Sequence, residues 1–312
     1  MTTKKESGFV RFLSSKKSVD DRALSNNVFD SLAAALPEVS PTERLKVLEV
    51  GAGIGTMIAR LADWKLLTFA EYTAVDADAA SVVESRRILA SWAAAAGHDF
   101  SPRSKSTAVI RTQAGEIWTK FMQADAYDFL SQPITGQAWD LGIAHAFLDL
   151  VDIEVILRQF CNFIRPGGLL YLTLNYDGET IFLPEVNPSL DTLILQLYNQ
   201  SMDERITDGR KTGGMHTGRK LLGCLTDLDT AVLAAGSSDW IVFPGPKGYP
   251  ADESFFLHYI IDTIHTELTG HPALDPNAFQ SWIQMRHNQV KKAELIFIAK
   301  NIDLLARISE DR

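Results

Sequence analysis

Residues 47–57 read Val-Leu-Glu-Val-Gly-Ala-Gly-Ile-Gly-Thr-Met, an apolar strand followed by a glycine loop and the start of a helix. Glycines at 51, 53 and 55 let the backbone pass close to a ligand at the carboxyl end of a strand, as open α/β sheets do when they bind nucleotides. The dinucleotide fingerprint needs a glycine at position 56, which is Thr56, and the carboxylate of Glu49 would repel a pyrophosphate. The segment therefore predicts an α/β nucleotide-binding sheet whose ligand carries no pyrophosphate.

Composition narrows the class of partner and the compartment. A chain of 312 residues, 46% hydrophobic, favours one elaborated domain, and a formal net charge of −9 argues against a nucleic-acid partner. Only Cys161 and Cys224 are present, which indicates neither a disulfide framework nor a cysteine-based zinc site. No apolar run is long enough for a signal peptide or a membrane span, so we expect a soluble cytoplasmic protein without a membrane partner. Both a monomer and a homodimer remain open.

The order of apolar segments predicts seven strands alternating with helices, and hence a doubly wound, mostly parallel sheet of the α/β class. Strands are expected at 45–50, 72–75, 117–123 (widened by a hairpin with 108–112), 140–144, 169–175, 240–243 and 294–299. Helices are expected at 20–36, 55–64, 79–96, 126–130, 153–164 and 217–235.

Two segments, at about 179–216 and 245–292, are too long for ordinary connections, and we expect them to form helical cap insertions over a substrate. The second is expected to be helical over 255–268 and 278–290. The chain is thus divided into an N-terminal helical lid over 1–44, a ligand-binding domain over 45–301 and a C-terminal tail over 302–312.

The glycine loop resembles motif I of the class I S-adenosylmethionine-dependent methyltransferases. S-adenosylmethionine has no phosphate and carries an ammonium and a sulfonium, both of which a carboxylate at Glu49 would attract. The other elements of that family follow in order: Asp76 about 20 residues after the loop, Asp125 after the third strand, the strand 140–145 and a helix stop at 165–168. The resemblance covers residues 27–175 well and the last strands loosely, and it implies a Rossmann-like fold with S-adenosylmethionine as cofactor and S-adenosylhomocysteine as product.

The resemblance also implies roles for individual residues. Asp76 would bind the ribose hydroxyls, Asp125 the adenine amino group, and Arg22, on a preceding helix, the cofactor carboxylate. Each has an ordinary alternative: a turn or cap for Asp76, the N-cap of the helix over 126–130 for Asp125, and an exposed ion pair for Arg22. The expected cofactor-binding residues are Glu49, Gly51, Ala52, Gly53, Gly55, Asp76, Ala77, Asp125, Ala126, Ala144, His145 and Arg22.

Two residues after the fourth strand are candidates for catalysis. His145 ends the stretch that looks like motif IV, beside the expected position of the methyl-bearing sulfur, and a near-neutral pKa would let it act as a base. Asp149, four residues on, would orient the imidazole if a helix begins near Ala146. The alternative is that His145 only lines the cofactor pocket.

Substrate contacts are expected from residues near the carboxyl end of the fifth strand and from the caps. Asn175 and Tyr176 follow that strand, although Asp177-Gly178 would also suit a simple turn. His216 begins a basic segment that is either a lid or a solvated loop, and Tyr259 lies in the second insertion. The remaining histidines lack metal-ligand spacing, so no metal is expected.

These observations favour transfer of a methyl group from S-adenosylmethionine to a small molecule by in-line displacement. Ala-His-Ala-Phe after the fourth strand differs from the motif that grips a flipped nucleobase, which argues against nucleic-acid methylation. Two alternatives remain open: an aminopropyltransferase-like enzyme, and a non-catalytic module that binds S-adenosylmethionine. The acceptor atom is left unidentified.

Overall fold

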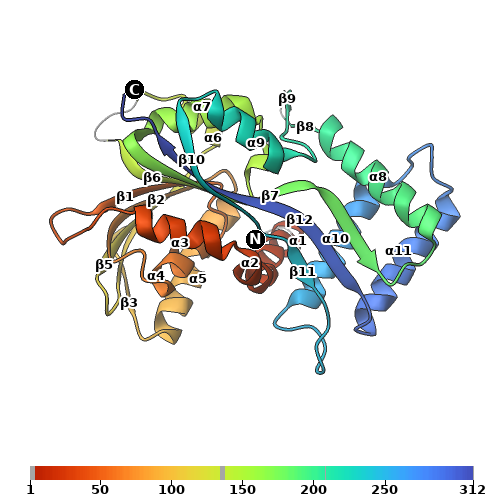
Figure 1. Cartoon of the computed structure of the whole chain (residues 1–312). Helices are drawn as coiled ribbons and strands as arrows, with labels where there is room; N and C mark the ends of the chain where they lie inside the picture. Colours follow the sequence, from red (N-terminus) through yellow and green to blue (C-terminus); the bar gives the residue numbers. More distant parts are fainter. Residues whose placement is uncertain (1–3, 134–137, 208, 312) are drawn as a thin grey trace.

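A mixed sheet of ten strands forms the centre of the computed structural model, which describes residues 4–133, 138–207 and 209–311 (Figure 1). Its strands are β1 (Leu45–Val50), β2 (Phe69–Asp76), β3 (Asp99–Pro102), β4 (Thr107–Arg111), β5 (Glu116–Gln123), β6 (Trp139–His145), β7 (Ile164–Leu183), β10 (Thr230–Ser237), β11 (Trp240–Val242) and β12 (Ile296–Ile308). Strands β8 (Ile206–Thr207) and β9 (Arg210–Lys211) form a separate small pair.

The helices are α1 (Lys4–Ser15), α2 (Lys17–Ala23), α3 (Asn26–Ala35), α4 (Thr56–Asp63), α5 (Ala79–Ala95), α6 (Ala126–Leu130), α7 (Ile153–Phe163), α8 (Pro188–Glu204), α9 (Thr217–Thr226), α10 (Glu253–Leu268) and α11 (Pro276–Lys291), with a short 3₁₀ helix η1 (Leu148–Leu150). Side-chain caps fix several of their starts: Asp78 accepts from the backbone N–H of Ser81 in α5, and Asp152 from that of Val155 in α7.

The strand order is β10-β12-β7-β6-β1-β2-β5-β4-β3, with β11 paired to β12. Strands β7, β6, β1, β2 and β5 run parallel, and the strands outside them pair antiparallel. From β1 the chain moves to β2 and then to the strands beyond it, β3, β4 and β5. It crosses from β5 to β6, which lies on the other side of β1. The carboxyl ends of β1 and β6 therefore form a topological switch point, where open α/β sheets bind their ligands.

Three hydrophobic clusters hold the fold together. One includes Val28, Met57 and Leu89 and packs α3, α4 and α5 on one face of the sheet; a second includes Phe129, Phe160 and Leu221 and packs α6, α7 and α9 on the other. The third surrounds Phe256 and Trp282 between α8, α10, α11 and the sheet. The doubly wound core is thus extended on one side by a helical cap.

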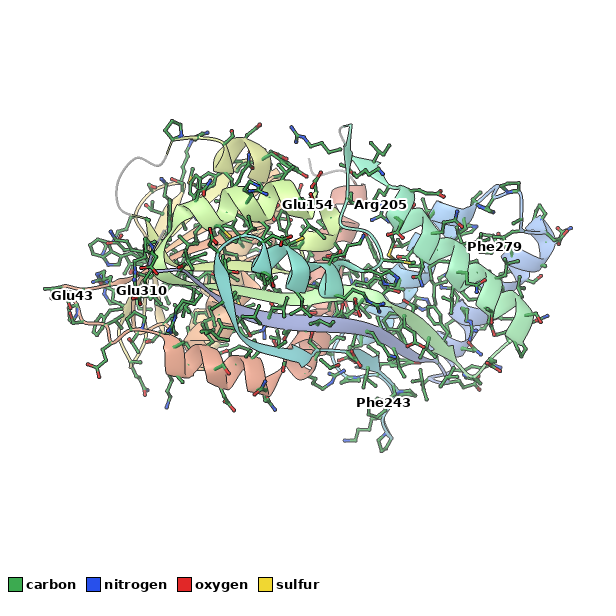
Figure 2. All side chains as sticks on the ribbon, turned by 45° about the horizontal axis from the view of Figure 1, so that its top comes forward. Glu43, Glu154, Arg205, Phe243, Phe279 and Glu310 are labelled. Carbon is green, nitrogen blue, oxygen red and sulfur yellow. The ribbon has the colours of Figure 1, made fainter. Side chains whose placement is uncertain are left out.

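Two long strands connect the core to this cap. Strand β7 has 20 residues and pairs with the 13 residues of β12 along most of its length, and Figure 1 shows both running from the core toward α8, α10 and α11. In the view of Figure 2, Glu154 lies over the core and Phe279 in the cap, with Arg205 between them. The expected insertions thus supply the cap helices, and the expected helices over 255–268 and 278–290 are confirmed as α10 and α11.

Several sequence expectations are corrected. The main sheet has ten strands among the described residues, compared with seven expected. Residues 217–235 are not one helix: α9 ends at Thr226, Asp229 takes a positive φ of 51°, and β10 then pairs with β12. Most of the expected tail, through Ile308, belongs to β12. Residues 1–3 and 312, within the expected lid and tail, lie outside the described residues.

The helix expected over 20–36 is also divided in two, with a break at Leu24 and Ser25. The backbone N–H of Ser25 donates to Asp303 on β12, at 2.9 Å, and Asp303 also accepts from the backbone N–H of Leu174 at 2.7 Å. Burial raises the pKa of Asp303 to about 6. With this break, α3 packs on the face of the sheet, whereas α1 and α2 lie near the switch point.

Candidate functional site

A cavity of about 280 Å³ lies at the switch point, where the loops after β1, β2, β5 and β6 converge. It is lined by Phe9, Leu13, Lys16, Gly51, Ala52, Gly53, Ile54, Thr56, Val75, Asp76, Ala77, Asp78, Ala124, Asp125, Ala126, His145, Ala146, Phe147, Leu150 and Val151. The structure therefore brings together the expected residues Gly51, Ala52, Gly53, Asp76, Ala77, Asp125, Ala126 and His145 around one space. Gly55, Ala144 and Glu49 lie outside this lining.

Asp76 fixes the glycine loop to the end of β2. Its Oδ2 accepts the backbone N–H of Gly53 at 2.6 Å, and its Oδ1 accepts that of Asp78 at 2.9 Å. Burial raises the pKa of Asp76, and the two backbone donors oppose that rise. Each oxygen keeps a second lone pair, so the carboxylate can still accept from hydroxyl groups of a ligand in the cavity.

Gly51 is required by both its backbone and its surroundings. Its φ is +68°, and a Cβ built on it would lie 2.3 Å from Cδ2 of Phe147. Gly51→Ala is therefore expected to push Phe147 or the loop into the cavity. It should weaken the binding of S-adenosylmethionine at least tenfold, as measured by calorimetric titration. Gly97→Ala is the matched control, because Gly97 has a φ of +71° but nothing within 4 Å of its Cβ position. Equal affinity in the two variants would contradict this account.

Asp125 caps a helix and also lines the cavity. Its Oδ1 accepts the backbone N–H groups of Tyr127 and Asp128 and so caps α6. This leaves Oδ2 without a hydrogen-bond partner among the described residues. Because the side chain also lines the cavity, that oxygen is available to an exocyclic amino group.

Glu49 does not face the ligand as the sequence suggested. It is buried, accepts the hydroxyl of Tyr72 at 2.8 Å and does not line the cavity. Burial raises its pKa to about 8, so the carboxyl is mostly protonated at neutral pH. Glu49 therefore presents no carboxylate to the cavity; the carboxylates that line it are Asp76, Asp78 and Asp125.

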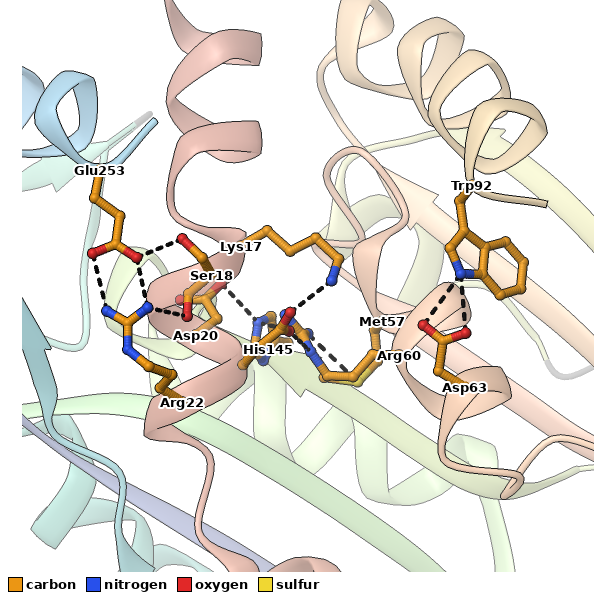
Figure 3. A network of polar contacts seen from close by, with 11 residues as sticks. Lys17, Ser18, Asp20, Arg22, Met57, Arg60, Asp63, Trp92, His145 and Glu253 are labelled. Carbon is orange, nitrogen blue, oxygen red and sulfur yellow. Dashed lines mark hydrogen bonds and ion pairs between the residues drawn. The ribbon is translucent and has the colours of Figure 1, made fainter. Parts of the chain in front are cut away.

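His145 belongs to a buried polar network that joins the N-terminal helices to the sheet (Figure 3). Its Nδ1 lies 2.8 Å from Oγ1 of Thr173, and its Nε2 lies 3.3 Å from both Oδ2 of Asp20 and Nη1 of Arg60. Burial and Arg60 lower the pKa of His145 to about 4, against the opposing effect of Asp20. The expectation of a near-neutral pKa is corrected, because this imidazole is a weak base.

Asp149 is not the partner of His145. No helix begins at Ala146, which has a φ of +49°, and η1 begins only at Leu148. Asp20, 125 residues away in sequence, takes the position beside the imidazole. Oδ1 of Asp149 is inaccessible to solvent and has no hydrogen-bond partner among the described residues.

Arg22 pairs with an acid, but this acid is buried and distant in sequence, so the pair is not the exposed helix ion pair of the alternative. Its guanidinium donates to both carboxylate oxygens of Glu253 on α10, at 2.6 and 3.0 Å, and Figure 3 shows the pair apart from His145. Hydrogen bonding to Glu253 raises the pKa of Arg22. Arg22 therefore fastens α2 to the cap, and Lys16 is the basic residue that lines the cavity.

A second cavity of about 260 Å³, which we call the inner chamber, adjoins the first. The residues Phe9, Leu13, Lys16, Ala146 and Leu150 line both. Two of the expected substrate-binding residues, Tyr176 and Tyr259, line the inner chamber, whereas Asn175 and His216 do not. Asn175 is fully buried and donates to the carbonyls of Leu172 and Ile302, and His216 lies against Gly178, where a Cβ would meet its ring at 2.4 Å.

Helix α1 lines both cavities along their shared wall. Phe12 stacks on Tyr259 of α10 with ring centroids 4.1 Å apart, and Arg11 pairs with Asp252 at 2.8 Å. Phe9, Leu13 and Lys16 were not identified as site residues from the sequence. The available signal was the spacing of Lys16 and Asp20, four residues apart, which are joined by an ion pair of 3.2 Å.

No helix in the described part of the chain is long and apolar enough to cross a membrane. Within residues 4–133, 138–207 and 209–311, no group of three or more histidine, cysteine or acidic side chains could hold a metal ion.

Comparison with known proteins gives matches at the level of structure alone. No family model and no curated protein matches the sequence. A proposed methyltransferase of Bacillus halodurans C-125 is 12% identical, with 91% of this chain and 100% of that chain covered and a TM-score of 0.49. The YcgJ protein of Bacillus subtilis is 14% identical over 91% and 97% of the two chains, with a TM-score of 0.47.

A methyltransferase of Thiobacillus denitrificans, solved with S-adenosylhomocysteine, is 12% identical over 94% and 97% of the two chains, with a TM-score of 0.44. It is described as an S-adenosylmethionine-dependent methyltransferase.

Proposed function

We propose that this protein is a methyltransferase that uses S-adenosylmethionine to methylate a small molecule. The observation that carries the proposal is the convergence of the glycine loop, Asp76 and Asp125 on one cavity at the switch point. This cavity shares a wall with the inner chamber, so a cofactor and an acceptor can meet beside Ala146 and Leu150. Ligands of open α/β sheets bind at this place in the fold.

The charges of the cofactor cavity support a cationic ligand without phosphate. Its described lining holds three acids, Asp76, Asp78 and Asp125, against one lysine, Lys16, which is itself paired with Asp20. The neutral His145 adds no charge at physiological pH. A pyrophosphate would meet repulsion here, whereas the ammonium and sulfonium of S-adenosylmethionine would not.

The chain's own residues hold and enclose the reactants. Asp76 would accept the ribose hydroxyls, Oδ2 of Asp125 the adenine amino group, and Lys16 would face the carboxylate end. Bound S-adenosylmethionine supplies an electrophilic methyl group. Alignment of the acceptor in the chamber and exclusion of water by α1 would then provide most of the acceleration.

Calorimetric titration of the full chain with four ligands tests the proposal: S-adenosylmethionine, S-adenosylhomocysteine, decarboxylated S-adenosylmethionine and NAD. We expect micromolar binding of the first two and none of NAD. Stronger binding of the decarboxylated compound would favour the aminopropyltransferase alternative. Binding of S-adenosylhomocysteine without methyl transfer to any acceptor would favour a non-catalytic module, and no binding of the first two would refute the cofactor.

A further inference from the structure

The charged side chains of the inner chamber are not balanced. Lys16 pairs with Asp20 at 3.2 Å and Arg205 lies 4.0 Å from Glu267, and neither of these acids lines the chamber. Asp149 is the one acid in the described lining, and its Oδ1 is buried without a hydrogen-bond partner in the described part of the chain. Asp149 is therefore the acidic group that the described lining offers to a ligand, beside two cations that are each paired with an acid outside it.

A buried carboxylate oxygen without a partner is costly, so its surroundings indicate what would satisfy it. Burial raises the pKa of Asp149, although its own backbone N–H, Lys16 and Arg205 oppose the rise. The carboxylate therefore accepts a proton more readily than an exposed aspartate does. Such a group suits a ligand that brings both a hydrogen-bond donor and a removable proton.

The rest of the chamber wall is mainly apolar and aromatic. Phe12, Tyr259 and Trp240 contribute rings from α1, α10 and β11, and Tyr198 adds another from α8. Aromatic faces attract organic cations as well as apolar groups. A volume of about 260 Å³ admits a body of roughly one ring with a short chain.

The position of Asp149 places this carboxylate beside the cofactor cavity. It lies on η1, directly after β6, between Ala146 and Leu150, which line both cavities. A group bound to Asp149 is thus held beside the boundary between the two cavities, where a methyl group would be transferred.

We propose that the acceptor is an amine carried on a ring-sized apolar body, and that Asp149 binds its ammonium group and takes its proton. This inference rests on the proposed function. The ammonium gives one proton to the Asp149 carboxylate, and the freed nitrogen lone pair forms a bond to the methyl carbon. The sulfur–methyl bond breaks with its electron pair left on sulfur, the methylated ammonium departs, and Asp149 releases its proton to solvent.

Three probes of similar size separate the possible chemistries: 2-phenylethylamine, 2-phenylethanol and phenylacetate. Each is titrated into the full chain, with and without saturating S-adenosylhomocysteine, and binding is measured by calorimetry. We expect the amine to bind at least tenfold more tightly than the other two. Asp149→Asn should weaken the amine at least tenfold and leave the affinities for 2-phenylethanol and S-adenosylhomocysteine unchanged.

Asp128→Asn is the matched control, because it removes the same charge from an exposed position on α6. Preference for phenylacetate or 2-phenylethanol, binding of none of the probes, or full amine affinity in Asp149→Asn would each overturn the inference. Failure of S-adenosylhomocysteine to bind would refute the proposed function instead, while the titrations without it would still report the chamber's preference.

Discussion

Replacing Asp76 with alanine is expected to weaken the binding of S-adenosylmethionine and S-adenosylhomocysteine at least hundredfold. Two effects combine in this variant. Hydrogen bonds from ribose hydroxyls to a carboxylate contribute about 1.5–3 kcal/mol each, and two of them correspond to a factor of roughly 100 or more. The variant also releases the backbone N–H groups of Gly53 and Asp78, which hold the glycine loop against β2.

Two further variants separate these effects. Asp76→Asn keeps one oxygen for a backbone donor and should lose less affinity than Asp76→Ala. Asp30→Ala removes the same charge from an exposed position on α3 and should bind as the unmodified protein does. Calorimetric titration gives the affinities, and circular dichroism confirms folding. Affinity within threefold of the unmodified protein for a folded Asp76→Ala would show that the ribose assignment is wrong.

The parallel core was predictable because local signals specify it. The apolar strand, the glycine loop and the caps of α5, α6 and α7 lie within a few residues of the structure they produce. Strand β10 is different: its residues Ala-Val-Leu-Ala-Ala suit a helix or a strand equally, and pairing with β12, about 70 residues later, decides between them. The same long-range pairing extends β7 to Leu183 and β12 to Ile308.

The candidate site was predictable to the same extent. The convergence of Gly53, Asp76 and Asp125 follows from strand order, since the ends of neighbouring parallel strands lie at one edge of the sheet. The surroundings of a buried charged residue do not follow from the order of the strands. Glu49 is buried with Tyr72, and His145 meets Asp20 and not the nearby Asp149, because elements distant in sequence pack around them.

Asp20→Ala is expected to lower the free energy of unfolding by about 3–5 kcal/mol, the usual result of removing one partner from a buried ion pair. Asp20 is buried. Its carboxylate accepts a hydrogen bond from the Nε1–H of Trp240 at 3.0 Å and forms an ion pair with Lys16. Burial alone would raise the pKa of Asp20, but Lys16, His145 and Arg60 together hold it below its usual range. Without this acid, the buried ammonium of Lys16 and the indole N–H of Trp240 would lose their partner.

The control is Asp252→Ala, which removes the ion pair between Arg11 of α1 and the start of α10. Both of these side chains are exposed, at 57% and 44%, so solvent replaces the lost contact and little change in stability is expected. Urea unfolding followed by tryptophan fluorescence compares the two variants. Equal loss of stability in both would show that α1 and α2 are held only by surface contacts. A much larger loss in Asp20→Ala would show that the buried network in Figure 3 joins α2 to the sheet beneath the cofactor cavity.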